Sequence, residues 1–426
     1  MKSIQIIPFA VPNLLNIFRQ FMYVLVFYVF IFQPPLIDKN LYVAVQFLII
    51  FFYAIFINKN FFVNFLKLFG RESYILTLII GFCLIRDLFK GEEVYVLRFI
   101  AWSFQTFVFG YFLIEVINRV NIKANRIKID IFSTLYNSAF VAGCITLILI
   151  LFPTIDQLYK GIQLDEYYNI YADFEVRYRA YGIAENLTFT YSYVLGFFAG
   201  YTLLVLKNRG LLIIPFWIFL IGILYNARIG FFAIILFTVY VSFMKKDIKS
   251  LLIFLSMTLL LFFVVSLSNN EFVTSILQNS DWALQFFYDL SDAVFGTNFS
   301  GSASSTVDTL TGDYIILPES FSEWIFGTGV SLFEMPLGQN SDVGFIIQLY
   351  YGGLFLLFLL VILVLFMCNR LLKIPESRWY LFIFIFSILI LNFKGFIFAA
   401  TPGGRLLFFL YIFFIIKYKY KEHYII

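Results

Sequence analysis

The chain has 426 residues, of which 62% are hydrophobic, 22% are aromatic and 13% are charged. Soluble domains are normally about 45–50% apolar, so this composition excludes a soluble globular protein and indicates an integral membrane protein. The net charge of +4 comes mostly from basic loops that orient the chain in the membrane, and it does not indicate a nucleic-acid partner.

Apolar runs long enough to cross a hydrocarbon layer of about 30 Å recur along the chain. They predict an all-α, polytopic membrane protein with about twelve transmembrane helices in one integral membrane domain, 1–426. The predicted spans are 13–33, 41–57, 74–90, 95–117, 131–152, 187–206, 211–226, 229–244, 250–267, 343–368, 378–394 and 403–417. The first span carries Arg19 and lacks a small-residue cleavage site, so we expect a membrane anchor here and not a removed signal peptide.

Basic residues concentrate in alternate connections and near both ends of the chain, as is typical of cytoplasmic segments. These residues are Lys2, Lys59, Lys67, Arg71, Arg119, Lys123, Arg126, Lys128, Lys207, Arg209, Lys245, Lys246, Lys249, Arg370, Lys373, Arg378, Lys417, Lys419 and Lys421. Acidic residues concentrate instead in 153–186 and 268–342. We therefore predict that both termini are cytoplasmic and that these two acidic segments are extracytoplasmic loops.

Cysteine and histidine usage narrows the possible chemistry. Cys83, Cys144 and Cys368 fall within predicted spans at unrelated spacings, which indicates neither a disulfide framework nor a metal motif. The single histidine, His423, lies in the predicted cytoplasmic tail, so chemistry at the outer face would proceed without histidine. The sequence has no Walker, Rossmann or zinc motif, and we expect no cofactor and no metal.

Most of the remaining basic residues fall at the predicted outer face, against the charge bias that sets the topology. They are Arg86, Lys90, Arg98, Lys160, Arg177, Arg179, Arg228, Lys394 and Arg405. Arginine near the centre of a membrane helix costs about 2.5–3.5 kcal/mol on insertion scales, so such residues usually face a protein interior or a cavity and have a partner.

Arg228 is the one charged residue of the stretch LIGILYNARIGFFAIILFTVYV, 220–241. The apolar run 211–244 is too long for one untilted span, and Asn226 tolerates a turn. We therefore predict a break near 226–228 that places Arg228 at the outer membrane boundary. There it either caps the turn and reaches to the headgroups or faces lipid pyrophosphates.

Two arginines open the next span in the stretch FEVRYRAYGIAENLTFTYSY. If this segment is extended, the alternate spacing of Arg177 and Arg179 directs both guanidinium groups to the same side. Guanidinium suits phosphate because its planar fork donates bidentate, charge-assisted hydrogen bonds. Alternatively, Arg177 pairs with Asp173 or Glu175 on a solvated loop.

The stretch FGTGVSLFEMPLGQNSDVGFIIQLYYGGLF closes the large loop 268–342, which has ten acidic residues and no Lys or Arg. This loop cannot bind phosphate by ion pairing. Its Ser, Thr, Asn and aromatic side chains could contact sugar, or it could be an acidic lid without a ligand. Gly327 and Gly329 allow a tight turn, and Asp342 lies where the chain re-enters the membrane.

Together, RYRAYGIAEN, YNARIGFF and FGTG…NSDVGFIIQLYYGGL resemble the Wzy-type O-antigen polymerases and, more distantly, the O-antigen ligases. The similarity covers about 170–400. By position, Arg179 with Gly182 matches an arginine–glycine motif of the family, Arg228 matches the arginine that opens a span, and Asp342 follows the large loop. Ligases carry a histidine near this last position and QNSDVGF has none, which favours a polymerase. Polymerases often carry arginine in the large loop, and this chain does not.

The resemblance implies a GT-C-like enzyme of the bacterial cytoplasmic (inner) membrane that is metal-independent and inverting. Its site would lie at the outer face and join oligosaccharide repeat units carried on undecaprenyl pyrophosphate, which serve as donor and acceptor, into O-antigen or capsule-type polysaccharide. A chain-length regulator and a flippase would be its partners.

The residues suit this chemistry. Breaking a glycosyl–pyrophosphate bond expels a lipid diphosphate, which needs cations; the candidates are Arg177, Arg179, Arg228 and Arg405, with Arg86, Arg98 and Lys394 as further substrate-binding residues. A carboxylate would accept the proton of the attacking hydroxyl, and Asp342 or Glu185 could supply it. Besides a ligase, the alternatives are a lipid-linked oligosaccharide flippase or transporter, which would not need an outer loop of about 75 residues, and an acyltransferase, which would need an acid–base histidine or a similar pair.

Overall fold

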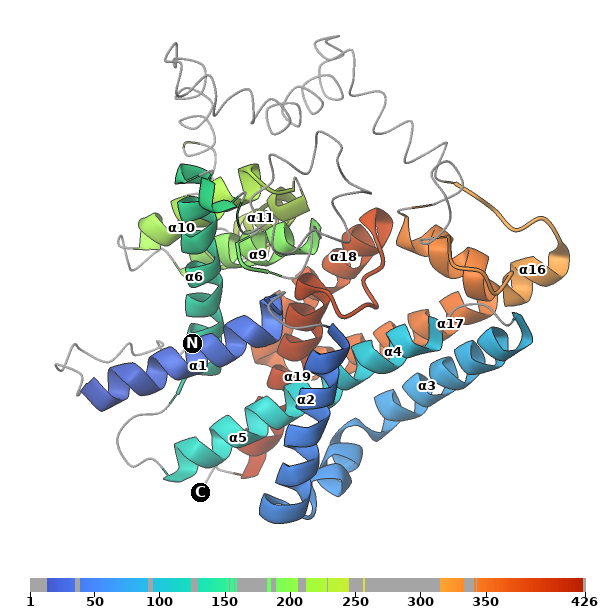
Figure 1. Ribbon diagram of the computed structural model, residues 1–426, viewed down its shortest axis with the longest axis horizontal. Helices are drawn as coiled ribbons and strands as arrows, with labels where there is room; N and C mark the ends of the chain where they lie inside the picture. Colours follow the sequence, from blue (N-terminus) through green and yellow to red (C-terminus); the bar gives the residue numbers. More distant parts are fainter. Residues whose placement is uncertain are drawn as a thin grey trace, which may run out of the picture.

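The structure is a computed structural model that describes residues 14–34, 39–90, 95–123, 129–152, 154–156, 158, 182–184, 189–205, 212–227, 229–244, 256, 315–332, 341 and 343–423. All regular elements within these ranges are helices (Figure 1). Six of the described helices are long and apolar enough to cross a membrane, and four more are apolar but shorter. The chain is therefore an all-helical protein of the multi-pass membrane type.

The helices follow the predicted spans closely. They are α1 (Leu14–Phe32), α2 (Lys39–Phe52) continued by the π-helix η1 (Tyr53–Ile57), α3 (Phe61–Lys90), α4 (Tyr95–Ser103) continued through η2 (Phe104–Phe109) into α5 (Gly110–Lys123), α6 (Ile131–Leu151), α9 (Phe189–Val205), α10 (Ile213–Leu224), α11 (Ile229–Val239) continued by η5 (Tyr240–Met244), α16 (Phe321–Phe326), α17 (Gly344–Leu372), the short 3-10 helix η8 (Pro375–Ser377), α18 (Arg378–Lys394) and α19 (Pro402–His423). They overlap every predicted span except 250–267, of which only Ser256 is described. The number of membrane crossings stays a prediction.

One helix begins much earlier than its predicted span. The third span was predicted to begin at residue 74, whereas α3 begins at Phe61, so Lys67 and Arg71 lie on a helix and not in a loop. The reason is a buried aromatic face: the ring centroid of Phe65 lies 5.6 Å from that of Phe69 and 5.5 Å from that of Tyr111 on α5. Lys67 and Arg71 stay exposed on the opposite face, which a charge count alone cannot distinguish from a loop.

Local caps explain where two helices begin. Asp130 precedes α6, and its carboxylate accepts a hydrogen bond from the backbone N–H of Phe132 at 3.2 Å. Ser320 and Glu323 form a capping box at the start of α16. Both arrangements satisfy backbone N–H groups that have no partner within the helix itself.

Helix ends that the charge pattern assigns to the cytoplasm contact one another, and we call this the inner end of the bundle. The ring of Phe132 at the start of α6 lies 4.4 Å from that of Tyr201 on α9 and 6.0 Å from that of Trp379 at the start of α18. Arg370, near the end of α17, donates to the buried carboxylate of Glu72 on α3 at 2.6 Å. These contacts join the starts of α6 and α18 to α9, and the end of α17 to α3. The alternation of all the spans and the side of the membrane that this end faces stay predictions.

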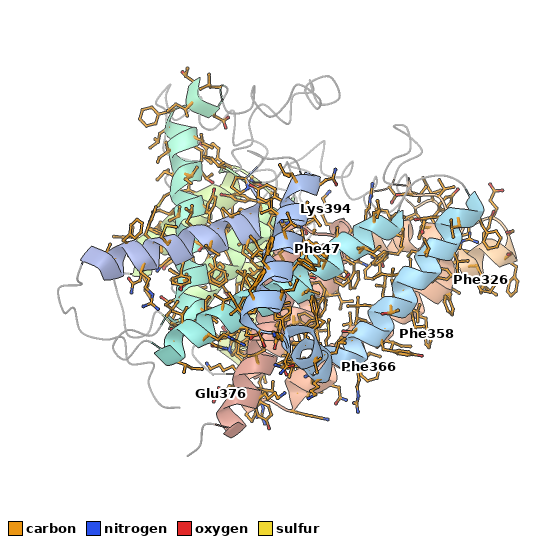
Figure 2. The ribbon with its side chains drawn as sticks, turned by 60° about the horizontal axis from the view of Figure 1, so that its bottom comes forward. Phe47, Phe326, Phe358, Phe366, Glu376 and Lys394 are labelled. Atoms are coloured by element: carbon orange, nitrogen blue, oxygen red, sulfur yellow. The ribbon has the colours of Figure 1, made fainter. Side chains whose placement is uncertain are left out.

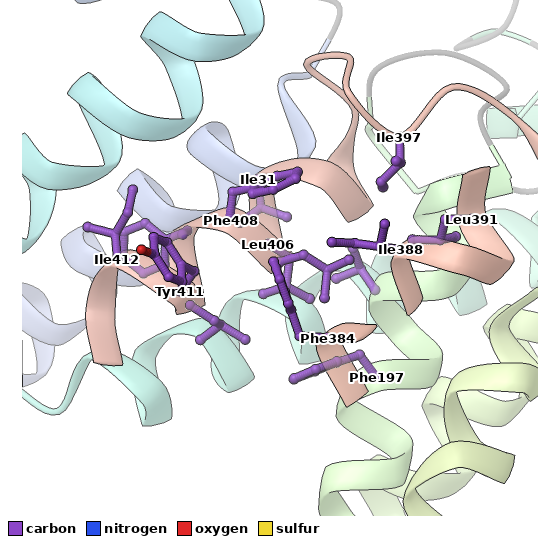
Figure 3. Close-up of a cluster of buried hydrophobic side chains, with 14 of the residues drawn as sticks. Ile31, Phe197, Phe384, Ile388, Leu391, Ile397, Leu406, Phe408, Tyr411 and Ile412 are labelled. Atoms are coloured by element: carbon purple, nitrogen blue, oxygen red, sulfur yellow. The ribbon is translucent and has the colours of Figure 1, made fainter. Parts of the chain in front are cut away.

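The core of the bundle surrounds α19. Every residue from 405 to 412 has 0% exposure, and a helix that is apolar around its whole circumference belongs in an interior. Figure 3 shows Leu406, Phe408 and Tyr411 of α19 beside Phe384 and Ile388 of α18. Figure 1 shows α19 near the middle of the bundle.

The outer surface of the bundle is apolar. Phe47 of α2, Phe326 of α16 and Phe358 of α17 are 54%, 48% and 61% exposed, and Figure 2 shows their side chains. Many large exposed aromatic and aliphatic side chains would be unfavourable in water. They are suited to contact with lipid, which agrees with the composition.

Candidate functional site

The structure describes four of the residues that we predicted for the site, namely Arg86, Arg98, Lys394 and Arg405. The other five, Arg177, Arg179, Glu185, Arg228 and Asp342, lie outside the described residues. Their chain neighbours Gly182, Ala184, Ala227, Ile229, Ser341 and Val343 are described, and these neighbours locate the predicted motifs within the fold.

The first turn of α9, residues 190–193, contacts the glycine that ends the RYRAYG motif. Gly182 has a φ of +59°, which favours glycine. A methyl group on its Cα would lie 2.5 Å from the hydroxyl oxygen of Tyr191. That hydroxyl donates to the backbone carbonyl of Ala142 on α6 at 3.0 Å. Only glycine fits between Tyr191 and α6 in this conformation.

The same turn of α9 holds the chain immediately before Arg228. The hydroxyl of Ser192 donates to the carbonyl oxygen of Ala227. A methyl group on Gly230 would lie 2.5 Å from the Ser192 hydroxyl, and one on Gly196 would lie 2.0 Å from the Gly230 carbonyl oxygen. Small residues thus let α9 and α11 approach backbone to backbone, as in membrane helix packing. The predicted break at 226–228 is confirmed, because α10 ends at Leu224 and α11 begins at Ile229.

A third contact of this turn reaches the start of α19. A methyl group on Gly403 would lie 3.0 Å from Thr190 and 3.2 Å from Tyr193. Two residues later, the fully buried Arg405 donates from Nε to the carbonyl of Ile31 at 2.9 Å and from Nη1 to that of Ala400 at 2.5 Å. Arg405 therefore joins the end of α1 to the segment before α19, and its predicted contact with a ligand stays a prediction.

A second group of polar residues lies where α3 meets α4. We call Arg86, Asp87, Tyr95, Arg98 and Tyr351 the α3–α4 junction. One carboxylate oxygen of Asp87 accepts from the Tyr351 hydroxyl at 2.5 Å, and the other accepts from the backbone N–H of Val96 at 2.8 Å. The rings of Tyr95 and Tyr351 are stacked with centroids 3.9 Å apart, and the Arg98 guanidinium lies 5.7 Å from the centroid of Tyr95.

Helix α17 is broken next to Tyr351 of the junction. Gly353 interrupts α17 with a φ of +66°. The carbonyl oxygens of Tyr350 and Tyr351 before the break accept from the backbone N–H groups of Thr328 and Gly329, at 2.7 and 2.9 Å. Backbone groups freed by a break within a membrane need such partners. We call this pairing of residues 327–329 with residues 350–353 the glycine clasp.

Arginine and glycine together fix the glycine clasp. Gly327 and Gly329 have φ values of +74° and +81°, which confirms the predicted tight turn. A methyl group on Gly327 would lie 2.1 Å from the carbonyl oxygen of Tyr351. Arg86 donates from Nη2 to the carbonyl of Gly327 at 2.5 Å. The end of the large predicted outer loop is thereby attached to α3 and α17.

The segment between α18 and α19 connects the two groups. Phe396 lies 5.8 Å from the ring of Tyr95 in the junction, and Phe398 lies 5.4 Å from the ring of Trp102. Ala400, in the same segment, accepts from Arg405. Lys394 ends α18 just before this segment, and Figure 2 labels its position. Arg86, Arg98, Lys394 and Arg405 therefore lie at one end of the bundle, the end opposite to Glu72 and Arg370, and we call it the outer end.

Our sequence reasoning missed several residues of this arrangement. Asp87 had a usable signal, because it is a carboxylate within the predicted span 74–90 and charged residues within spans usually have a partner and a function. Tyr191 and Ser192 had none, since TYSY reads as an ordinary helix start. Among the described residues, no group of three or more His, Cys, Asp or Glu side chains is arranged to hold a metal ion.

The basic side chains of the outer end differ in their surroundings, since Arg405 is fully buried and donates to backbone carbonyls. Four basic side chains lie there, Asp87 is the described carboxylate of the junction, and both of its oxygens already accept hydrogen bonds. No protein-family model, no curated protein and no solved structure matches the chain.

Proposed function

We propose that the protein is a polysaccharide polymerase that joins oligosaccharide repeat units carried on undecaprenyl pyrophosphate at the outer face of the bacterial cytoplasmic membrane. One observation carries this proposal: a single turn of α9 contacts Gly182, Ala227 and Gly403. Each of these residues lies within three positions of a predicted phosphate-binding arginine, namely Arg179, Arg228 and Arg405. The chain next to each of these three arginines thus contacts the same turn of α9.

The proposed reaction transfers a glycan from one lipid carrier to another. The bond between the anomeric carbon and the pyrophosphate oxygen breaks, and its electron pair leaves with the lipid diphosphate. A hydroxyl oxygen of the acceptor sugar bonds to the anomeric carbon and loses its proton to a carboxylate, for which Asp342 and Glu185 are the proposed candidates. Arginine suits the leaving group because guanidinium stays ionised and donates bidentate hydrogen bonds to phosphate.

A deletion strain tests this proposal against a flippase. Without a polymerase, single repeat units are still exported and a ligase can attach one unit to its acceptor, so a gel shows the single-unit band and no ladder. Without a flippase, the units stay on the cytoplasmic leaflet and the single-unit band disappears as well. Loss of that band in a strain with a working ligase would contradict the polymerase assignment. Mass spectrometry of the accumulated lipid-linked glycans identifies the substrate.

Complementation of the same strain tests the site. Arg228→Ala should abolish the ladder at a normal protein level, and Arg228→Lys should restore it only in part, because lysine keeps the charge but lacks the planar fork. His423→Ala is the matched control and should leave the ladder unchanged, since the tail lies across the bilayer in the predicted topology. Long chains with Arg228→Ala would mean that this arginine only anchors its helix at the membrane boundary. Loss of long chains with His423→Ala would mean that the predicted topology is inverted.

A further inference from the structure

Two hydrogen-bond donors of the α3–α4 junction lack an acceptor. The Nε of Arg86 and the hydroxyl of Tyr95 are buried and have no hydrogen-bond partner within the part of the chain that the structure describes. Tyr95 is 2% exposed as a whole residue. Buried polar groups in native proteins are nearly always paired, and each exception needs an explanation such as an absent ligand.

Both donors are held in place by the surrounding residues. The guanidinium of Arg86 is anchored through Nη2 on the carbonyl of Gly327. The ring of Tyr95 is fixed by stacking on Tyr351, whose own hydroxyl is bonded to Asp87. A donor that is already fixed in place loses little entropy when it binds an acceptor. These two donors are therefore suited to a ligand with several acceptor oxygens.

The ionised groups described at the junction are two arginines and one aspartate. Arg86 and Arg98 each carry one positive charge, and Asp87 carries one negative charge whose two oxygens accept from Tyr351 and Val96. These three ionised groups leave an excess of one positive charge, whereas the whole segment 86–98 has three basic and three acidic residues. Phosphate oxygens are strong acceptors for both arginine and tyrosine donors.

The surface beside the junction is apolar and suited to contact with lipid. Leu88 and Phe89 of α3 are 74% and 83% exposed, and Leu97 of α4 is 54% exposed. A phosphate attached to a polyprenyl chain could therefore approach with its chain in the bilayer against these side chains. A free phosphate would not use this apolar surface.

We propose that the α3–α4 junction is a second phosphate-binding site, distinct from the arginine motifs on the α9 turn, and that it takes the diphosphate of a polyprenyl-linked substrate. Tyr95 and Arg86 donate to its oxygens, and Arg98 supplies further charge. The choice of ligand rests on the proposed function, in which donor and acceptor each bring a diphosphate; the two unpartnered donors do not rest on it.

Titration of the purified full chain in phosphatidylcholine nanodiscs with farnesyl diphosphate tests the site. The experiment uses the Arg228→Ala background, so that binding at the α9 turn is weakened and the junction is measured. Tyr95→Phe keeps the ring and its stacking but removes the hydroxyl, and it should weaken binding about tenfold or more, the equivalent of one hydrogen bond to a charged group. The matched control Tyr53→Phe removes a buried hydroxyl that bonds to Glu115 at the inner end and should leave affinity unchanged.

Thermal unfolding of the same variants distinguishes a ligand donor from a structural hydroxyl. Because the Tyr95 hydroxyl is unpartnered, Tyr95→Phe should not lower the melting temperature, whereas Tyr53→Phe should lower it. A lowered melting temperature with unchanged affinity in Tyr95→Phe would overturn the proposal, as would the absence of binding in the Arg228→Ala background.

Competitors identify the source of the phosphate. Farnesol should not compete, and inorganic pyrophosphate should compete at least about tenfold more weakly than the lipid form because it lacks the apolar chain. Equal competition by pyrophosphate would overturn the lipid-linked assignment. Binding of farnesyl diphosphate is measured without glycan transfer. Loss of binding at the junction with intact polymerisation in cells would contradict only the second site, whereas intact binding without polymerisation would contradict only the proposed function.

Discussion

Replacing Gly327 by alanine should break the glycine clasp. Gly327 has φ +74° and ψ 174°, a region that side chains other than hydrogen occupy at a cost of about 1–3 kcal/mol. The added methyl group would also lie 2.1 Å from the Tyr351 carbonyl oxygen, so the turn must move. The backbone bonds from Thr328 and Gly329 would then be lost, at about 0.5–1.5 kcal/mol each. The total loss in folding free energy is about 2–6 kcal/mol.

Gly70→Ala is the matched control. Gly70 lies on α3, and a methyl group there would meet nothing within 4 Å. Alanine in a helix is about 0.5–1 kcal/mol more favourable than glycine, so this variant should be as stable as the wild type or slightly more stable. Thermal unfolding of the detergent-solubilised full chain, monitored by loss of the monodisperse peak in size-exclusion chromatography, measures both. Equal melting temperatures for Gly327→Ala and Gly70→Ala would refute the reasoning from the clasp.

Three further predictions address the topology, the inner end and the α9 turn. A membrane-impermeant thiol reagent should label Ser302→Cys and not Lys246→Cys in intact cells; the opposite pattern would invert the topology. Arg370→Leu should destabilise the protein by about 3 kcal/mol, because the buried Glu72 carboxylate loses its cationic partner and keeps only the hydrogen bond from the Tyr411 hydroxyl among the contacts described. Glu72→Leu added to it should restore much of that stability in thermal unfolding; no recovery would argue against the pair. Ser192→Ala should shorten the glycan ladder at a normal protein level, since it frees the carbonyl before Arg228; an unchanged ladder would mean that this bond does not position Arg228.

Most of the helices were predictable because they are apolar runs, and the break before Ile229 was predictable because the run was too long for one span. The short helix α16, Phe321–Phe326, was not predicted, since it lies within the predicted loop 268–342. The start of α3 was not predicted, since its buried phenylalanines Phe61, Phe65 and Phe69 share a stretch with the exposed basic residues Lys67 and Arg71. Burial against α5 decided the boundary there, and such burial depends on a partner distant in sequence.

The candidate site was predictable only in part. The sequence identified Gly327 and Gly329 as a turn, but the partner of that turn is a break at Gly353, more than twenty residues along the chain, inside what reads as one apolar span. Arg405 was predicted at an outer turn, and it does lie at the start of α19. The full burial of Arg405 could not be predicted from the sequence, because the central position of α19 depends on how the other helices pack around it. Pairings of this kind are set by tertiary structure and leave no local pattern.

The position of α19 has a consequence for biogenesis. α19 follows every other described helix along the chain, yet its own residues 405 to 412 are each 0% exposed. The ribosome therefore releases the earlier helices into the bilayer before the helix that they surround has been made. We therefore expect those helices to stay separable until α19 enters. Chains stalled before residue 402 should then remain loosely associated and become substrates for membrane proteases.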